Sequence, residues 1–276
     1  LRGHNKSSSL LLPVACGARG LANSNKRTSV KVHDQNNPAG HYTAFEASPE
    51  LRRVGEKLVW EVTQGNWHQH DALIEVIERF DRESGKALVL DAIHAMGLNR
   101  TAEHFVQSTV QSLSGTINKL TKQIVPKLDR EQMTLAASHI RSLSITMPAE
   151  NGFTAMVGYQ IPDSLNERRI DSVRRIRDGN WKEEKRAISQ QLNELGDLLL
   201  EEIYLKSVRM MGFGFFTEKL VQGGAVIGRG VKNQLINWAI GSLQEPEFMM
   251  LADYMDLRHL YLPEPMPHQF LYYPND

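Results

Sequence analysis

The sequence predicts a mainly α-helical fold with one β-hairpin at about residues 143–160 and an extended arm at each end. Apolar residues recur at helical spacing through most of residues 48–243, which favours an irregular helical bundle or a set of helical hairpins. An Asn-Gly pair at 151–152 separates two segments that alternate between apolar and polar residues. We therefore expect a basic N-terminal arm (1–47), a helical body with the hairpin (48–243), and an acidic, Pro- and aromatic-rich C-terminal arm (244–276).

The overall composition is that of a globular protein. The 276 residues include 32 Lys or Arg and 32 Asp or Glu, so the net charge is zero. A single cysteine, Cys16, excludes an internal disulfide framework. The longest uncharged segment, residues 104–118, is polar and shorter than the ~20 apolar residues that a membrane-spanning helix needs, so we expect no transmembrane span.

The charge is unevenly distributed along the chain. Residues 1–33 contain six basic residues, five serines and no acidic residue, which is typical of a mitochondrial transit peptide. Three other interpretations remain open: a secretory signal around residues 10–18, a bacterial lipoprotein site at Cys16, and a retained basic arm that binds RNA or an acidic partner. The Asn, Pro and Gly residues of the following segment, 34–47, predict a loop.

The body begins with a clear helix signal at Ser48-Pro49-Glu50, where Ser caps, Pro presets φ and Glu complements the helix dipole. This helix should end at Gly65-Asn66. Further helices are predicted at about 67–80, 86–97 and 101–124, with a break at Ser84-Gly85, and another should begin at Asp129. The irregular spacing of the breaks argues against a helical-repeat protein.

The second half of the body contains the hairpin and two more helices. Strands near 143–147 and 153–160 should pair, and their apolar side must be covered, because an isolated hairpin is marginal in water. Asp163 should cap a helix that ends at Gly179. A helix of about 30 residues then follows from Trp181, with a narrow apolar seam at Ile188, Leu192, Leu195 and Leu199.

Two segments superficially resemble ligand sites. His68 and His70 stand beside Asp71, but helical geometry points residues two apart in different directions, so we expect no shared metal. His94, His104 and His139 form no metal-binding motif, although neighbouring helices can bring them together. The glycines of residues 211–230 match neither phosphate-binding fingerprint, and we interpret them as close helix packing or an irregular packed loop. No catalytic, metal or cofactor residue is predicted.

Two further sets of residues are candidate contacts with partners. One helix carries candidate contacts for anionic lipid or RNA, although interleaved acids also fit a solvated face with local ion pairs: Arg168, Arg169, Arg174, Arg175 and Arg177. The C-terminal arm holds five of the eleven prolines and should lie extended in a groove of its own body or of a neighbour. Its candidate partner-docking residues are Tyr261, Phe270, Tyr272 and Tyr273.

Two irregular arms around a helical body suit a component of a large assembly. We expect a non-catalytic accessory subunit of a mitochondrial complex, on the matrix side or associated with the inner membrane, with an ATP synthase or respiratory complex favoured. The partners would be other protein subunits, with peripheral contact to anionic lipid, and RNA through the N-terminal arm only. The alternatives are a mitochondrial ribosomal protein and a bacterial secreted effector or enzyme with a helical cleft around His68, His70 and the glycine segment. A cleft with convergent polar groups would favour the last class.

Overall fold

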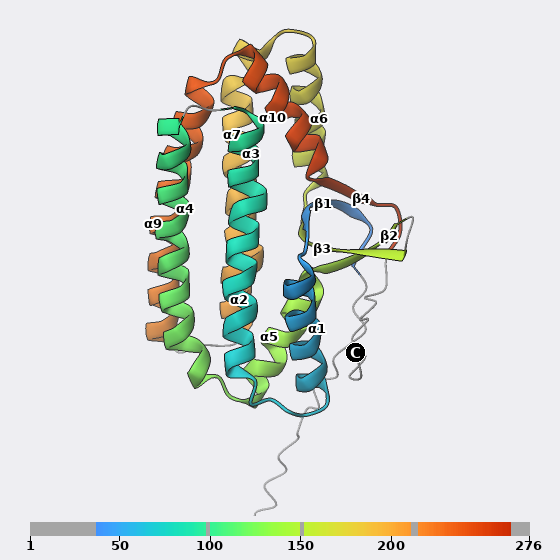
Figure 1. Cartoon of the computed structure of the whole chain (residues 1–276), viewed down its shortest axis with the longest axis vertical. Coiled ribbons are helices and arrows are strands. Elements are labelled where there is room, and N and C mark those ends of the chain that lie inside the picture. Colours follow the sequence, from blue (N-terminus) through green and yellow to red (C-terminus); the bar gives the residue numbers. More distant parts are fainter. Residues whose placement is uncertain (1–36, 98–99, 150–151, 211–214, 266–276) are drawn as a thin grey trace, which may run out of the picture. The chain divides into compact units, whose positions relative to one another are not determined.

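A computed structural model describes residues 37–97, 100–149, 152–210 and 215–265. The chain divides into two units, Leu1–Lys31 and Val32–Asp276, and every described residue belongs to the second. These residues form a mainly helical fold with one four-stranded antiparallel sheet (Figure 1), which confirms the predicted fold class.

The helices account for most of the described residues. They are α1 (Pro49–Thr63), α2 (His70–Gly85), α3 (Asp91–Ala95), α4 (Arg100–Ile124), α5 (Arg130–Leu143), α6 (Asp163–Arg177), α7 (Trp181–Leu199), α8 (Lys206–Met210), α9 (Phe215–Ser242) and α10 (Glu245–Leu257). A π-helical segment, Lys86–Leu90, joins α2 to α3, and another, Leu200–Leu205, joins α7 to α8, so each pair forms one continuous helical rod. A 3-10 turn, Val125–Lys127, follows α4.

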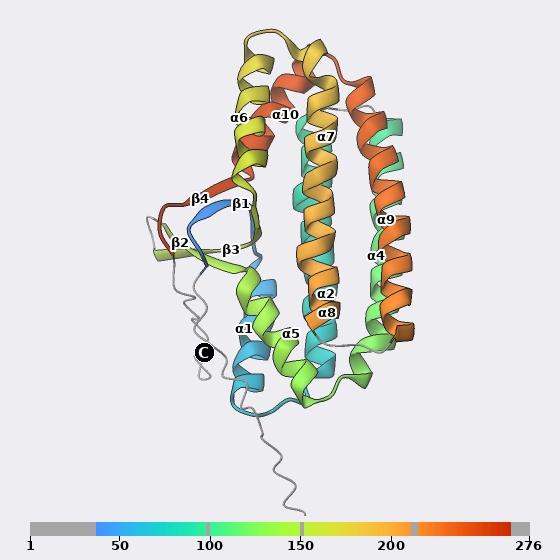
Figure 2. The ribbon, with the colours of Figure 1, turned by 180° about the vertical axis from the view of Figure 1, so that it is seen from behind.

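Four long helices form a ring. Helix α4 packs against α2 on one side and α9 on the other, and α9 packs against α7. Both views show α4 beside α9, with α2 and α7 making up the other side of the ring (Figures 1 and 2). Helices α1 and α5 pack together below the sheet, and α6 and α10 pack together beyond it. Separate apolar clusters hold these regions, one around α1, α2 and α5 and one around α6, α7, α9 and α10.

The strands are β1 (Gly40–Glu46), β2 (Ser144–Ala149), β3 (Gly152–Ile161) and β4 (His259–Leu262), in the order β2-β3-β1-β4. Strands β2 and β3 pair from Ser144 opposite Val157 to Ala149 opposite Gly152, which confirms the predicted hairpin strands. Residue 151 of the predicted Asn-Gly turn lies outside the described residues. Ile145 is buried, as a hairpin with a covered apolar side requires.

The sequence predicts a loop at 34–47, but this prediction is wrong for most of residues 37–47, the part of that range that the structure describes. Residues 40–46 form β1, a central strand that pairs with β3 on one side and β4 on the other. Tyr42, Ala44 and Phe45 are buried, and Asn37 donates a 2.8 Å hydrogen bond to the carbonyl of Ser144. The N-terminal arm therefore does not extend to residue 47, because this segment supplies apolar side chains and backbone pairing to the body.

The predicted C-terminal arm is also wrong in its first half. Residues 245–257 form α10, whose Phe248, Leu251 and Ala252 are buried in the cluster around α6 and α7. Residues 259–262 form β4, the edge strand beside β1. The folded body thus continues through Leu262, well past the predicted boundary at residue 243.

The predicted break at Ser84-Gly85 does not exist. Gly85 is the last residue of α2, and the π-helical segment continues directly from it. A Cβ at Gly85 would lie 3.0 Å from a methyl group of Val110, so this glycine permits the close approach of α4 rather than ending a helix. The predicted starts at Ser48 and Asp129 are confirmed, since Ser48 caps α1 and Asp129 forms a capping box with Gln132.

Candidate functional site

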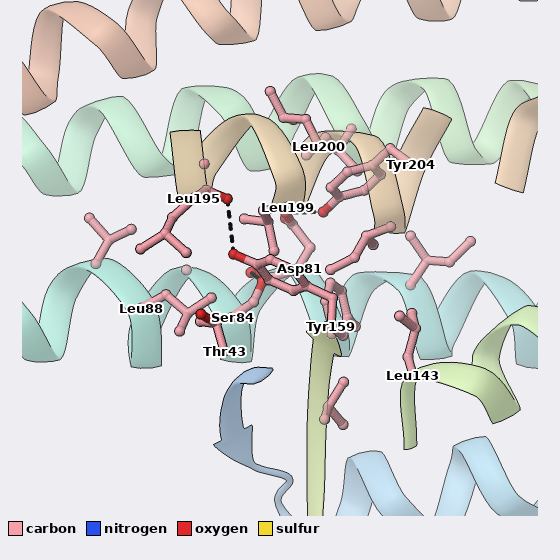
Figure 3. Close-up of a pocket in the computed structure, with 18 of the residues that line it drawn as sticks. Thr43, Asp81, Ser84, Leu88, Leu143, Tyr159, Leu195, Leu199, Leu200 and Tyr204 are labelled. Atoms are coloured by element: carbon pink, nitrogen blue, oxygen red, sulfur yellow. Dashed lines mark hydrogen bonds between the residues drawn. The ribbon is translucent and has the colours of Figure 1, made fainter. Parts of the chain in front are cut away.

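A cavity of about 560 Å³ lies within the ring of α2, α4, α7 and α9. It extends to β1 and β3 at one side, and Figure 3 shows the part where these strands meet α2 and α7. Protein interiors contain few voids larger than a water molecule, so a space of this size is not ordinary packing. Its volume lies within the ~300–1,000 Å³ typical of small-molecule sites.

The cavity wall is mostly apolar. Leucines from three segments dominate the part seen in Figure 3: Leu88, Leu143, Leu195, Leu199 and Leu200. Both π-helical segments contribute to the wall, through Leu88 and Val89 of one and through Leu200, Ile203, Tyr204 and Leu205 of the other. A π segment changes the side-chain register along a helix and is common at functional sites.

The main polar group in this apolar wall is Asp81 of α2. It follows Leu73 and Ile77 at intervals of four residues, so it shares their inward face. Asp81 is only 8% exposed. Its Oδ1 accepts a 3.3 Å hydrogen bond from the hydroxyl of Tyr204, which the second π-helical segment carries (Figure 3). Its Oδ2 is buried and has no hydrogen-bond partner among the described residues.

The environment of Asp81 disfavours its charge. Burial raises the pKa of this carboxyl, and the hydroxyls of Ser114 and Tyr204 lower it in part. Burial and the neighbouring Asp81 likewise raise the pKa of Tyr204 well above its usual value. A buried acid with a perturbed pKa at a cavity wall is a typical mark of a functional site.

Further polar groups border the same space. The Tyr159 hydroxyl donates a 2.9 Å hydrogen bond to the carbonyl of Leu195, and burial raises the pKa of Tyr159. The Ser84 hydroxyl donates to the carbonyl of Asp81. His139 of α5 is buried, and its Nε2 has no partner within the part of the chain that is described. Burial, and then the positive charge of Lys206, lower the pKa of His139 and keep the ring neutral.

No family model, no curated protein and no solved structure matches the chain. Asp81 contacts tyrosine and serine hydroxyls, and no histidine–carboxylate or histidine–hydroxyl pair faces the cavity among the residues described. The buried carboxyl and the tyrosine hydroxyl are both able to hydrogen-bond a molecule in the cavity.

A second polar cluster lies at the sheet end of the cavity. His41 Nδ1 and His259 Nε2 are 2.9 Å apart on neighbouring strands, so one ring donates its proton to the other. Arg169 forms an ion pair with Asp256 close to this pair. Burial lowers the pKa of His259 to about 4, and the positive charges of Arg169 and His41 add to this effect, while Asp256 opposes it.

We expect His259 to make folding sensitive to acid. Its pKa is lower in the folded protein than the ~6.5 of an unfolded chain, so the unfolded state takes up the proton first. The free energy of unfolding should therefore fall as the pH falls from about 6.5 to about 4. Urea unfolding across this range should show a shallower fall for His259→Gln than for the natural sequence. Equal slopes for the two proteins would contradict this expectation.

The predicted histidine pair lies away from the cavity. His70 begins α2, and its Nε2 lies 2.9 Å from the carbonyl of Leu128. His68 precedes the helix and stacks on Trp67. The sequence argument assumed that both histidines lie on one helix. Only His70 does, so helical spacing is not what separates the two rings. His94 pairs with Glu103 at the surface, whereas His139 borders the cavity, and no set of three or more metal-ligand side chains occurs among the described residues.

The five candidate arginines of α6 all make ion pairs. The partners are Glu194 for Arg168, Asp256 for Arg169, Asp171 for Arg174, Glu184 for Arg175, and both Asp253 and Asp256 for Arg177. Arg169 is buried and also donates to Asn166, so it ties α6 to α10 rather than facing a partner surface. Contact of the other four with lipid or RNA stays a prediction.

The remaining candidates fall in three places. Tyr261 lies on β4, is 53% exposed and stacks on His41. Phe270, Tyr272 and Tyr273 lie outside the described residues. The glycines from 223 to 230 are part of α9 rather than of an irregular loop, and a Cβ at Gly223 or Gly230 would meet nothing within 4 Å. Close helix packing therefore does not explain these two glycines.

No helix among the described residues is long and apolar enough to cross a membrane.

Proposed function

We propose that this protein binds an apolar small molecule in the cavity within the ring of α2, α4, α7 and α9. The observation that carries the proposal is the 560 Å³ space with a mostly apolar wall and a few buried polar groups at one place. Such a wall stabilises a ligand by removing its apolar surface from water, and the polar groups fix its orientation.

A cavity-filling substitution tests the proposal. Ser84 lines the cavity and is 6% exposed, so Ser84→Leu places a larger apolar side chain in the space. We expect the natural protein to bind N-phenyl-1-naphthylamine, an apolar fluorophore, with one-to-one saturation and a strong rise in fluorescence. Ser84→Leu should weaken this binding by about tenfold or more, since a loss of ~1.4 kcal/mol corresponds to that factor.

Ser164→Leu is the matched control, because Ser164 is exposed on α6 and receives the same change of side chain. It should bind the fluorophore as the natural protein does. Leu88→Phe is a second cavity-filling variant if Ser84→Leu fails to fold. Saturable binding that survives both cavity variants, or no binding at all, would contradict the proposal.

The accessory-subunit role in a mitochondrial complex stays a separate prediction, as do the ribosomal and effector alternatives. It depends on residues 1–33 and on the aromatic residues after 265, and both lie outside the described residues. Convergent polar groups favour the class with a helical cleft, although the cavity is not lined by His68 or His70, where that interpretation placed it.

A further inference from the structure

One carboxyl group of the cavity wall has no positively charged partner among the described residues. The four Lys or Arg side chains that line the cavity all have other anionic partners: Arg52 pairs with Glu56, Arg169 with Asp256, Lys232 with Asp197, and Arg258 with Asp91. Glu56, the other lining carboxylate, is neutralised by Arg52. Among the described lining residues, Asp81 is thus the carboxyl that makes no ion pair.

The geometry of Asp81 also leaves a free acceptor. Tyr204 donates to Oδ1, and the Ser114 hydroxyl also stabilises the charged carboxyl, whereas Oδ2 is buried and makes no hydrogen bond of good geometry. A buried polar atom without a partner costs free energy, and a buried carboxylate costs far more unless a cation neutralises it. Every Lys and Arg side chain of the described wall pairs with another acid, so a cation that neutralises Asp81 can be supplied by a bound ligand.

We propose that the ligand is an amphiphilic amine, whose protonated nitrogen binds Asp81 Oδ2 while its apolar body lies among the leucines of α2, α7 and the second π-helical segment. This inference rests on the proposed function, since it needs the cavity to accept an apolar molecule. The ammonium group donates a charge-assisted hydrogen bond to Oδ2, and the Tyr204 hydroxyl holds Oδ1 in place. The amine thereby supplies both the missing donor and the missing positive charge.

Three ligands with the same apolar chain separate this inference from its alternatives. Decylamine, decanol and decanoate should be titrated at pH 7 against the fluorophore bound to the natural protein. We expect decylamine to displace it at a concentration about tenfold or more below that of decanol, because charge-assisted hydrogen bonds are about twice as strong as neutral ones. Decanoate should bind most weakly, because its carboxylate would face that of Asp81.

Asp81→Asn should remove the preference for the amine, so that decylamine and decanol displace the fluorophore at similar concentrations. Asp71→Asn is the matched control, because Asp71 is exposed in the first turn of the same helix and loses the same charge. It should keep the preference of the natural protein. Circular dichroism and thermal unfolding check that each variant is folded. If a variant does not fold, the comparison of the three ligands on the natural protein still shows whether the cavity prefers an amine.

The outcomes distinguish the two proposals. Decanol binding as tightly as decylamine would overturn the amine inference and indicate that Asp81 is a neutral hydrogen-bonding group, while the apolar site would stand. A preference for the amine that survives in Asp81→Asn would also overturn it. Failure of all three compounds and of the fluorophore to bind would instead remove the proposed function itself.

Discussion

Phe248→Ala should lower the free energy of unfolding by about 3–5 kcal/mol. The Phe248 side chain is fully buried, with its ring 5.8 Å from that of Trp181 and the Lys185 amine 5.7 Å from its centre. It lies on α10, within the apolar cluster that also includes residues of α4, α6, α7 and α9. Truncation removes this buried apolar surface and leaves a cavity, because the surrounding helices can move only partly into the empty space.

The effect can be measured by guanidinium unfolding followed by circular dichroism, with Met250→Ala as the control. Met250 lies two residues away on the same helix and is 45% exposed, so its loss should change the stability by no more than ~0.5 kcal/mol. If the two variants were equally stable, α10 would not be part of the core. Residues 244–276 would then be the separate arm that the sequence suggested.

The elements that the sequence predicts well are those set by neighbouring residues. Ser48 and Asp129 cap their helices with their own side chains, and Asn151-Gly152 sits between alternating segments that pair with each other. Strand β1 is different, since its partners lie more than 100 residues away in β3 and β4. Local turn residues at 36–40 suggested a loop, and nothing nearby indicated the strands that would complete the pairing.

The C-terminal helix was missed for a different reason. Pro246 is one of the five prolines that suggested an extended arm, but it lies in the first turn of α10, where the missing N–H costs nothing. Gln244 and Glu247 form a capping box around it. The signal for this helix is therefore the position of Pro246 after Gln244, whereas the overall proline content of residues 244–276 favours an extended chain.

The candidate site was partly visible in the sequence. Asp81 and Ser84 interrupt the apolar face of α2 at positions where a core residue is expected, and Tyr204 lies four residues after Leu200 in an apolar segment. Such polar residues on an apolar face were a usable signal. The π-helical segment that brings Ile203 and Tyr204 to the cavity wall, and the ion pairs that Arg52 and Lys232 make with other acids, depend on the folded arrangement.

Gly158→Ala should destabilise the protein by an amount near the upper end of the ~1–3 kcal/mol typical of overpacking. Gly158 lies on β3 directly opposite Ala44 of β1. A Cβ there would stand 2.7 Å from the Thr43 carbonyl oxygen, 2.7 Å from the Ala44 Cβ and 3.0 Å from the Ala44 Cα. Because two of these atoms belong to the backbone, the neighbour cannot move aside by changing a rotamer, and the two central strands must separate.

The control is Gly115→Ala on α4, where a Cβ would meet nothing within 4 Å. This exposed helical position should gain about 0.5–1 kcal/mol, so the same change of residue should have opposite signs at the two sites. The strands that Gly158 holds together also bring Thr43 and Tyr159 to the cavity wall. Gly158→Ala should therefore weaken binding of the fluorophore as well as lower the unfolding midpoint, whereas Gly115→Ala should leave binding unchanged. Full stability in Gly158→Ala would mean that β1 is not paired with β3, and the wall that the sheet contributes to the cavity would then be wrong.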